Sequence, residues 1–204
     1  MRESGILMHI TSLPAPYGIG TMGKDAYAFV DFLVRAGQRY WQILPLTPTG
    51  YGDSPYQSLG ACAGNHYLID LDRLADEGLL KKEEIQNIPW GSNPARVDFG
   101  AMYAHRMNVL RQAFQRFAPD EAYETFVEQN RSWLEDYALF MSLKDLHQGR
   151  SWHEWSPQYQ VLDTRTRKAA LTELADSITY YQFIQFIFFK QWHELKLYAN
   201  KKGI

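Results

Sequence analysis

The first 71 residues alternate between short apolar runs and long loops rich in glycine and proline. Residues 5–10 (GILMHI) and 39–46 (RYWQILPL) have the length and composition of buried strands. Between them, residues 24–36 carry apolar side chains at helical spacing, and Gly37 follows as a helix stop. Residues 66–71 (HYLIDL) are predicted as a further extended segment. The order strand, helix, strand predicts a parallel β-α-β crossover and therefore an α/β fold.

The remainder of the chain has mainly helical periodicity. Tyr103, Met107 and Leu110 begin a series of apolar positions at steps of three and four, which is typical of the buried face of an amphipathic helix. The predicted elements are, in order, a helix over 74–80, a polar loop over 82–98, amphipathic helices over 103–117 and 126–141, a Trp-rich linker over 149–157 and a long helix over 166–200.

This change of pattern divides the chain into three predicted regions. Residues 1–73 are expected to begin an α/β domain, residues 74–163 to form a mainly helical insertion, and residues 164–204 to form a long helix that returns to the first region. Two strands and one bridging helix do not close a sheet, so a further strand is expected after Ile204. The sequence is therefore interpreted as part of a larger domain.

Composition and charge exclude several classes of partner. The 204 residues include 21 basic and 23 acidic side chains without a polybasic run, which argues against nucleic acid. The most apolar stretch, 178–192, is interrupted by glutamines and is shorter than the roughly 20 residues that span a bilayer, which argues against a membrane. Cys62 stands alone, so no intrachain disulfide is expected, as suits a cytoplasmic protein.

Gly18, Gly20 and Gly23 match the G-x-G-x-x-G pattern of dinucleotide-binding folds. In those folds the glycines directly follow the strand, whereas TSLPAPY separates them from it here. The second predicted strand also ends in Pro-Leu-Thr rather than near the acidic residue that binds ribose. We interpret the glycines as making the loop compact, and no nucleotide cofactor is expected.

Other chemical signals are weak. The six histidines are scattered without ligand spacing, so no metal is expected, and Cys62 has no identifiable activating neighbour. Hydrolysis or transfer at a glycosidic bond needs two carboxylates. Asp53, Asp70 and Asp72 are candidates, but the spacing of Asp70 and Asp72 also suits caps and turns, and that structural interpretation is favoured.

The loop at 50–58 (GYGDSPYQS) holds two tyrosines among glycine, proline and small polar residues. A rigid tyrosine ring can stack on the apolar face of a sugar, and the serine, aspartate and glutamine side chains can bind its hydroxyls. The same composition also fits a tyrosine that merely packs the loop. Composition alone leaves both interpretations open.

Several longer sequence segments resemble one protein family. HITSLPAPYGIGTMG, GQRYWQILPLTPTGYGDSPYQS and AGNHYLIDL look like the opening of the 4-α-glucanotransferases of the amylomaltase and disproportionating-enzyme type. WLEDYALFMSLK and the C-terminal FIFFKQWHELKLYANKKGI are similar to that family too, so the resemblance covers essentially the whole chain.

The resemblance implies the N-terminal part of a (β/α)8 TIM barrel with a mainly helical insertion, as in glycoside hydrolase family 77. It implies transfer of α-1,4-glucan segments from maltodextrin, starch or glycogen to glucose or glucan acceptors by retaining double displacement. The family's next strand and its three catalytic carboxylates would lie beyond Ile204. No catalytic side chain is therefore assigned, and the 204 residues alone are expected to be inactive.

Motif matching also implies substrate-binding residues. Tyr56 would stack on the glucose near the cleavage point, Ser54 would bind neighbouring hydroxyls, and Tyr51 would lie at the edge of the groove or at a remote glucan contact. Asp53 and Asn65 would shape the loop. His9 is a further candidate that could face the barrel mouth or be a core histidine.

The sequence also leaves open an alternative function and predicts how the isolated chain behaves. The same segment could instead serve as a non-catalytic glucan-binding or interaction module. Unpaired barrel strands leave open edges and an uncovered apolar face, so the isolated chain is expected to self-associate or to stay molten.

Overall fold

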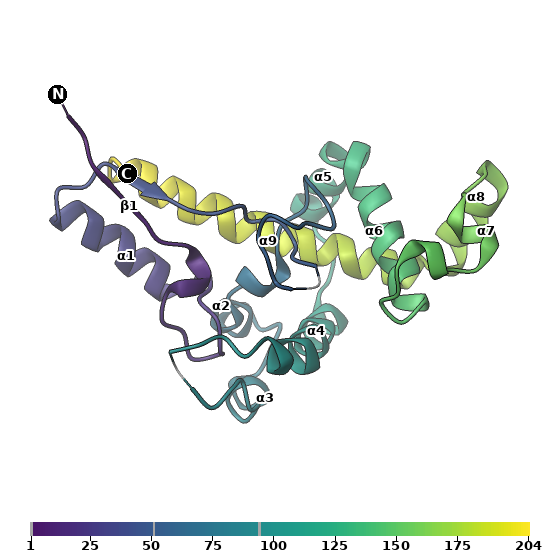
Figure 1. Cartoon of the computed structure of the whole chain (residues 1–204), viewed down its shortest axis with the longest axis horizontal. Coiled ribbons are helices and arrows are strands. Elements are labelled where there is room, and N and C mark those ends of the chain that lie inside the picture. The colour runs from purple at the N-terminus through teal and green to yellow at the C-terminus, as the bar shows by residue number, and fades with distance from the viewer. Residues whose placement is uncertain (1, 51, 94) are drawn as a thin grey trace. The chain divides into compact units, whose positions relative to one another are not determined.

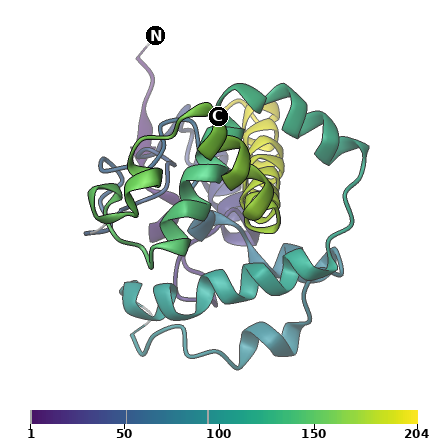
Figure 2. The same cartoon turned by 90° about the vertical axis from the view of Figure 1, so that its right-hand side faces the viewer.

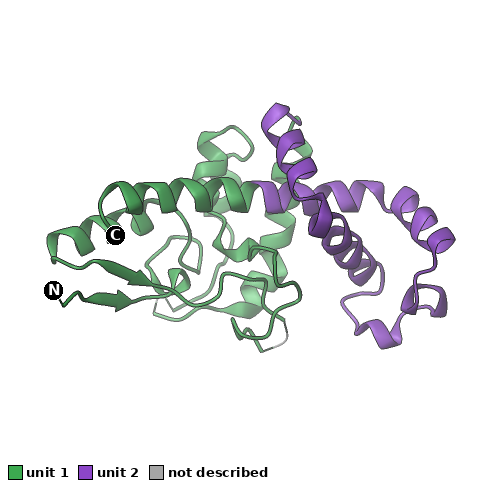
Figure 3. Ribbon diagram, turned by 90° about the horizontal axis from the view of Figure 1, so that it is seen from above, with its two compact units in different colours: residues 1–118, 187–204 green, residues 119–186 purple. Residues whose placement is uncertain are grey.

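The computed structural model describes residues 2–50, 52–93 and 95–204 (Figure 1). They form two compact units, one of residues 1–118 with 187–204 and one of residues 119–186 (Figure 3). The predicted domain boundaries after residues 73 and 163 refer to a larger barrel and stay a prediction.

A parallel strand pair lies at the start of the first unit. Strand β1 (Gly5–Leu7) pairs with β2 (Tyr40–Gln42), with Ile6 opposite Trp41, and helix α1 (Lys24–Arg35) connects them. The predicted strand, helix and strand are therefore confirmed, although the strands are shorter than predicted. After β1 the chain bends into a 3₁₀ turn, η1 (Ile10–Ser12), which ends the extended run early.

Helix α1 forms as its pattern predicts. Ala26, Val30 and Leu33 are fully buried on one face. Gly37 follows with a φ of 67°, a left-handed conformation that glycine adopts without strain, and its N–H donates to the Val34 carbonyl at 3.1 Å.

The extended segment predicted at 66–71 is wrong. The chain there forms a 3₁₀ turn, η2 (His66–Leu68), and then helix α2 (Leu71–Asp76). Side chains at the two N-caps explain the difference, because Asn65 accepts a hydrogen bond from the Tyr67 N–H at 2.9 Å and Asp70 accepts one from the Arg73 N–H at 3.0 Å. The predicted helix at 74–80 accordingly begins and ends earlier.

Asp70 and Asp72 have the structural roles favoured by their spacing. Besides capping α2, Asp70 accepts from the Thr21 hydroxyl at 2.6 Å, and Asp72 accepts from the Tyr17 hydroxyl at 2.6 Å. Both bonds tie the loop after β1 to α2.

The polar segment predicted as a loop at 82–98 contains a short helix, α3 (Lys82–Gln86). Its Glu84 side chain accepts from the Lys81 N–H at 2.9 Å and from Arg116 of α4 (Phe99–Arg116) at 2.6 Å. Helices α3 and α4 lie side by side (Figures 1 and 2).

Helix α4 buries a different face from the predicted one. Tyr103 is 53% exposed. The buried positions are Met102, Arg106, Val109, Leu110 and Ala113, a stripe that includes Leu110 but lies beside Tyr103 and Met107. A buried arginine in the stripe broke the apolar pattern from which the face was predicted.

The second unit is helical. Its elements are α5 (Glu121–Gln129), α6 (Arg131–Leu146), η3 (Trp152–Glu154), α7 (Pro157–Gln160), α8 (Thr164–Glu173) and the first part of α9 (Ala175–Lys201). The single helix predicted over 166–200 is wrong, because the chain leaves helical geometry at Leu174, between α8 and α9. Within the unit, the Tyr181 hydroxyl donates to Asp145 at 2.6 Å.

Among the described residues, no helix is both long enough and apolar enough to cross a membrane.

Candidate glucan-binding site

Two long loops meet at one edge of the strand pair. Because β1 and β2 are parallel, the segments that follow them leave from the same edge. Together with Phe99 of α4, they enclose a cavity of about 160 Å³. Its lining residues are His9, Thr11, Ser12 and Ile19 from the first loop, Leu44, Pro45, Thr49, Asp53, Pro55, Asn65 and Tyr67 from the second, and Phe99.

His9 lies in the cavity wall just after β1. Its Nδ1 accepts a hydrogen bond from the Leu44 N–H at 3.3 Å, which links the two loops. Burial lowers the pKa of His9, so the neutral imidazole is favoured near pH 7. The ring therefore has the backbone partner of a core histidine while it also lines the cavity.

Asn65 holds the far end of the second loop. The residue is buried, its N–H donates to the Leu46 carbonyl at 2.7 Å, and its side chain caps η2. Both bonds are intramolecular, so Asn65 shapes the cavity wall.

The segment at 50–58 is closed by its own backbone. Thr49 and Ser58 form an isolated antiparallel bridge, and the Gly50 N–H donates to the Gln57 carbonyl at 3.1 Å. Two residues at its tip, Gly52 with a φ of 90° and Asp53 with a φ of 55°, adopt left-handed conformations. Glycine and aspartate are residue types that tolerate this region, so the sequence supports a tight turn here.

Tyr56 and Ser54 occupy the outer side of this loop. Tyr56 is 75% exposed, an unusual exposure for a large aromatic side chain. The Ser54 hydroxyl accepts from the Tyr56 N–H at 3.3 Å, which orients that part of the loop. The Tyr56 ring is therefore carried on a shaped loop with most of its surface available to a ligand.

Asp53 links the loop to helix α4. Its carboxylate accepts a hydrogen bond from the Tyr103 hydroxyl at 2.7 Å, and the same hydroxyl lies 3.5 Å from the Gly50 carbonyl oxygen. Burial and the Asp53 carboxylate together raise the pKa of Tyr103 to about 12, so the phenol remains a donor at neutral pH.

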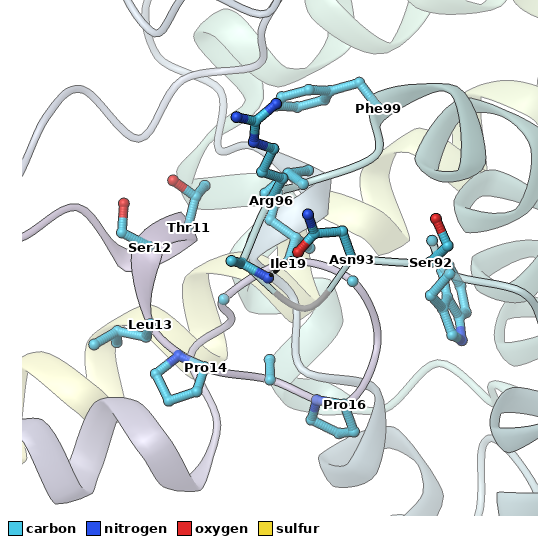
Figure 4. A pocket seen from close by; sticks show the side chains of 17 residues that line it. Thr11, Ser12, Leu13, Pro14, Pro16, Ile19, Ser92, Asn93, Arg96 and Phe99 are labelled. Atoms are coloured by element: carbon cyan, nitrogen blue, oxygen red, sulfur yellow. Dashed lines mark hydrogen bonds between the residues drawn. The ribbon is translucent and has the colours of Figure 1, made fainter.

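A larger hollow of about 620 Å³ adjoins this site. Residues of the 11–20 loop form one wall, and residues 90–93, 95–97 and 99 form the other (Figure 4). Its lining combines apolar side chains, including Pro14, Pro16, Trp90 and Phe99, with polar ones, including Thr11, Ser12, Asn93 and Arg96. Thr11, Ser12, Ile19 and Phe99 line both hollows.

The chemistry of these surfaces suits a sugar better than a metal or an acid–base reaction. Aromatic and proline faces can cover the apolar side of a pyranose while hydroxyl and amide groups bind its rim. Among the described residues that line the two hollows, Asp53 carries the one carboxylate, whereas glycosidic catalysis needs two. Within the same part of the chain, no group of three His, Cys, Asp or Glu side chains is placed to hold a metal ion.

The structure brings some predicted site residues together and leaves others apart. His9, Asp53 and Asn65 line one cavity, whereas Ser54 and Tyr56 lie on the loop beside it. Tyr51 lies outside the described residues. No residue's contact with a glucan follows from these positions alone, so the assigned binding roles stay predictions.

Sequence reasoning missed Tyr103, Phe99 and Tyr67 as parts of the site. Phe99 and Tyr67 line the cavity, and Tyr103 binds Asp53. Tyr103 was interpreted as a packing residue because its spacing matched a helix face. The sequence carries no local signal for this role, because the partner of the Tyr103 hydroxyl, Asp53, lies 50 positions away.

Comparison with known proteins gives one consistent result. The profile of glycoside hydrolase family 77, described as 4-alpha-glucanotransferase, matches residues 8–204. A 4-alpha-glucanotransferase of Clostridium butyricum is 46% identical over 199 residues, which is 97% of this chain and 41% of the relative. One from Thermus thermophilus is 46% identical over 209 residues, or 100% of this chain and 41% of the relative.

A solved structure agrees in fold. The amylomaltase of Streptococcus agalactiae, in complex with acarbose, matches with a TM-score of 0.95 and 44% identity. The match covers 100% of this chain and 42% of that one. The chain therefore spans about two-fifths of the length of the proteins it resembles.

Proposed function

Since the chain belongs to the 4-alpha-glucanotransferase family, we propose that this protein transfers α-1,4-glucan segments to glucose or glucan acceptors. The 204 residues span 41% of the length of the curated relatives. The transfer activity is therefore proposed for a protein of the full length of those relatives. The part proposed for this chain is to bind and orient the glucan.

The β1–α1–β2 unit is proposed as the start of a (β/α)8 barrel. The parallel pairing and the two long loops at one strand edge support this, because β/α-barrel enzymes build their sites on loops at the carboxyl ends of the strands. Residues 74–163 would be the helical insertion and residues 164–204 the return to the barrel.

One observation carries the proposal for the site. Tyr56 is 75% exposed on a loop that borders a cavity lined by both βα loops. We assign its ring to stack on a glucosyl unit near the cleavage point and the Ser54 hydroxyl to bind the neighbouring sugar. Asp53, Asn65 and His9 would hold the walls that these contacts need, and Tyr51 would extend the groove.

The proposed reaction is a retaining double displacement. One carboxylate attacks the anomeric carbon to form a glycosyl-enzyme ester and expels the leaving glucan, which a second carboxylic acid protonates. That second group, now a carboxylate, takes the proton of the acceptor 4-hydroxyl, whose oxygen attacks the anomeric carbon and releases the first carboxylate. These two carboxyl groups must lie about 5–5.5 Å apart. We assign both carboxyl groups to the part of the full-length relatives that these 204 residues do not match. We propose no metal or cofactor.

Maltodextrins, starch or glycogen are the proposed substrates. The S. agalactiae neighbour was solved with acarbose, an oligosaccharide analogue, which supports an α-glucan ligand. An exposed single cysteine, Cys62, suits the reducing cytoplasm, which we propose as the location. Leu7 and Tyr40 of the strand pair are 56% and 57% exposed, and self-association of the isolated chain through this pair stays a prediction.

A maltotriose assay with the full native protein tests the function. The expected result is disproportionation, with glucose and longer dextrins formed together and little net hydrolysis. Measurable dextrin binding without any transfer would favour a non-catalytic glucan-binding module. The absence of both dextrin binding and glucan transfer would contradict the proposed function.

A further inference from the structure

Helix α4 contributes a hydrogen bond to the 50–58 loop from outside the βα loops. The Tyr103 hydroxyl donates to the Asp53 carboxylate at 2.7 Å, across 50 positions of sequence. The acceptor is a carboxylate, and hydrogen bonds to charged acceptors are stronger than those between neutral groups. Tyr103 is 53% exposed, so burial of its ring does not account for its position.

Tyr103 supplies the side-chain hydrogen bonds that reach this loop from outside, among the described residues, since its hydroxyl also lies 3.5 Å from the Gly50 carbonyl oxygen. The other side-chain hydrogen bonds of the loop stay between Ser54 and Gly60. A Cβ added at Gly52 would meet nothing within 4 Å, and Tyr56 is mostly exposed, so packing at the tip is loose. The left-handed φ of 55° at Asp53 costs a non-glycine residue some free energy, although aspartate tolerates it better than most, so a contact such as the Tyr103 bond helps to stabilise it.

Helix α4 is in turn a firm support. Arg106, one turn after Tyr103, is fully buried, and its guanidinium donates to the carbonyls of Tyr67 and Ile69. The Tyr67 ring meets the Tyr103 ring edge-on, with centroids 6.0 Å apart. The donor that reaches Asp53 is therefore mounted on a helix fixed to the cavity wall.

We propose that Tyr103 is a positioning residue that holds the 50–58 loop, through Asp53, in the conformation that presents Tyr56. The inference rests on the proposed function, because it concerns the same glucan-binding loop. The Tyr103 hydroxyl contacts the loop at Asp53 and Gly50. Loss of one such bond lowers the population of the held loop, so glucan binding weakens by about three- to tenfold while the fold persists.

The test compares four variants with the wild type in the full native protein. Tyr103→Phe removes the donor. Asp53→Gly removes the acceptor, and glycine can adopt the same positive φ as Asp53. The double variant removes both partners. Asp53→Asn keeps an acceptor and tolerates the left-handed conformation. Maltoheptaose affinity and hydrogen exchange of peptides covering residues 50–58 are measured for each.

Tyr40→Phe is the matched control. Its hydroxyl also donates to a carboxylate, Glu3, at 2.5 Å, and its side chain is 57% exposed, yet it lies on β2 away from the loop. The control should leave maltoheptaose affinity and loop exchange unchanged.

The expected result is faster exchange over 50–58 and a three- to tenfold weaker affinity for Tyr103→Phe and for Asp53→Gly. The double variant should match Tyr103→Phe, and Asp53→Asn should lie between the wild type and Asp53→Gly, because its amide oxygen accepts a weaker bond than a carboxylate does. Additive losses in the double variant, unchanged exchange in Tyr103→Phe, or faster exchange with unchanged affinity would each overturn the inference. A wild type that binds no maltoheptaose contradicts the proposed function instead, and faster exchange in Tyr103→Phe would then still establish that Tyr103 holds the loop.

Discussion

The two loops that build the site differ in how closely they are packed. In the first, Ile10, Leu13, Ile19 and Met22 are buried, and a Cβ added at Gly20 would lie within 3 Å of three backbone atoms. In the second, the 50–58 segment exposes Tyr56, and Gly52 has open space around it. The first loop is held by close packing together with the bonds of Tyr17 and Thr21 to Asp72 and Asp70, and the second mainly by polar bonds near solvent.

This difference separates a framework from a ligand-facing surface. Close packing leaves the first loop little freedom, so it can serve as a fixed wall. Polar bonds near solvent are individually weak, so the second loop can adjust around a sugar while keeping its shape. Substitutions should therefore affect stability in the first loop and binding in the second.

Gly20→Ala should have the largest effect. The added Cβ would lie 1.9 Å from the Ile10 carbonyl oxygen, so backbone must move, at a cost of roughly 3 kcal/mol or more in unfolding free energy. Gly52→Ala is the control, with open space and only the cost of a positive φ, about 1–2 kcal/mol. Urea unfolding of both variants would measure this, and equal losses would contradict the contrast between the loops.

Thr21→Val should come next. The substitution removes a buried hydroxyl that donates to Asp70 at 2.6 Å and leaves that carboxylate with one donor fewer, which should cost about 1–3 kcal/mol of unfolding free energy. Thr21→Ser keeps the hydroxyl and should lose much less. Thermal unfolding of the pair is the measurement, and the same midpoint for both would show that the bond does not fasten the first loop.

Tyr56→Ala should leave stability unchanged and weaken dextrin binding. The ring is 75% exposed, so little packing is lost, whereas loss of a sugar-stacking face should reduce maltoheptaose affinity roughly tenfold. Tyr56→Phe retains the ring and should bind nearly as well as the wild type. Calorimetric titration would decide, and an unaffected Tyr56→Ala would remove this side chain from the proposed site.

The smallest effect is a pH dependence away from both loops. Hydrogen bonds from Arg116 and from the Lys81 N–H lower the pKa of Glu84 from its ordinary 4.5 to about 2. The folded state therefore holds its proton less tightly than the unfolded state, so this contribution is present above about pH 4.5 and is lost as pH falls toward 2. Glu84→Gln should flatten stability over that window, and an unchanged pH profile would show that the contribution is screened.

The fold was predictable where one periodicity dominated. Strand, helix and strand were identified at 5–46 because Ala26, Val30 and Leu33 repeat at helical spacing between two short apolar runs. The same reasoning failed at 66–71, where the capping side chains of Asn65 and Asp70 decided the conformation. Local polar bonds of this kind leave little trace in an apolar pattern.

The site was predictable only in part. The residue types at 50–58 indicated a sugar-facing loop, and resemblance rather than spacing gave Tyr56 and Ser54 their roles. Tyr103 could not be assigned, because its bond to Asp53 joins residues 50 positions apart. Arg106 was hidden for a similar reason, since an arginine in a helix is expected at the surface unless its partners are known.

A crystal structure of the full native protein with bound maltoheptaose tests the central claim most directly. The account predicts a glucosyl ring stacked on Tyr56, with the Ser54 hydroxyl within hydrogen-bonding distance of a neighbouring sugar and the 50–58 loop still joined to Tyr103. A glucan bound elsewhere, with Tyr56 left free in solvent, would contradict it.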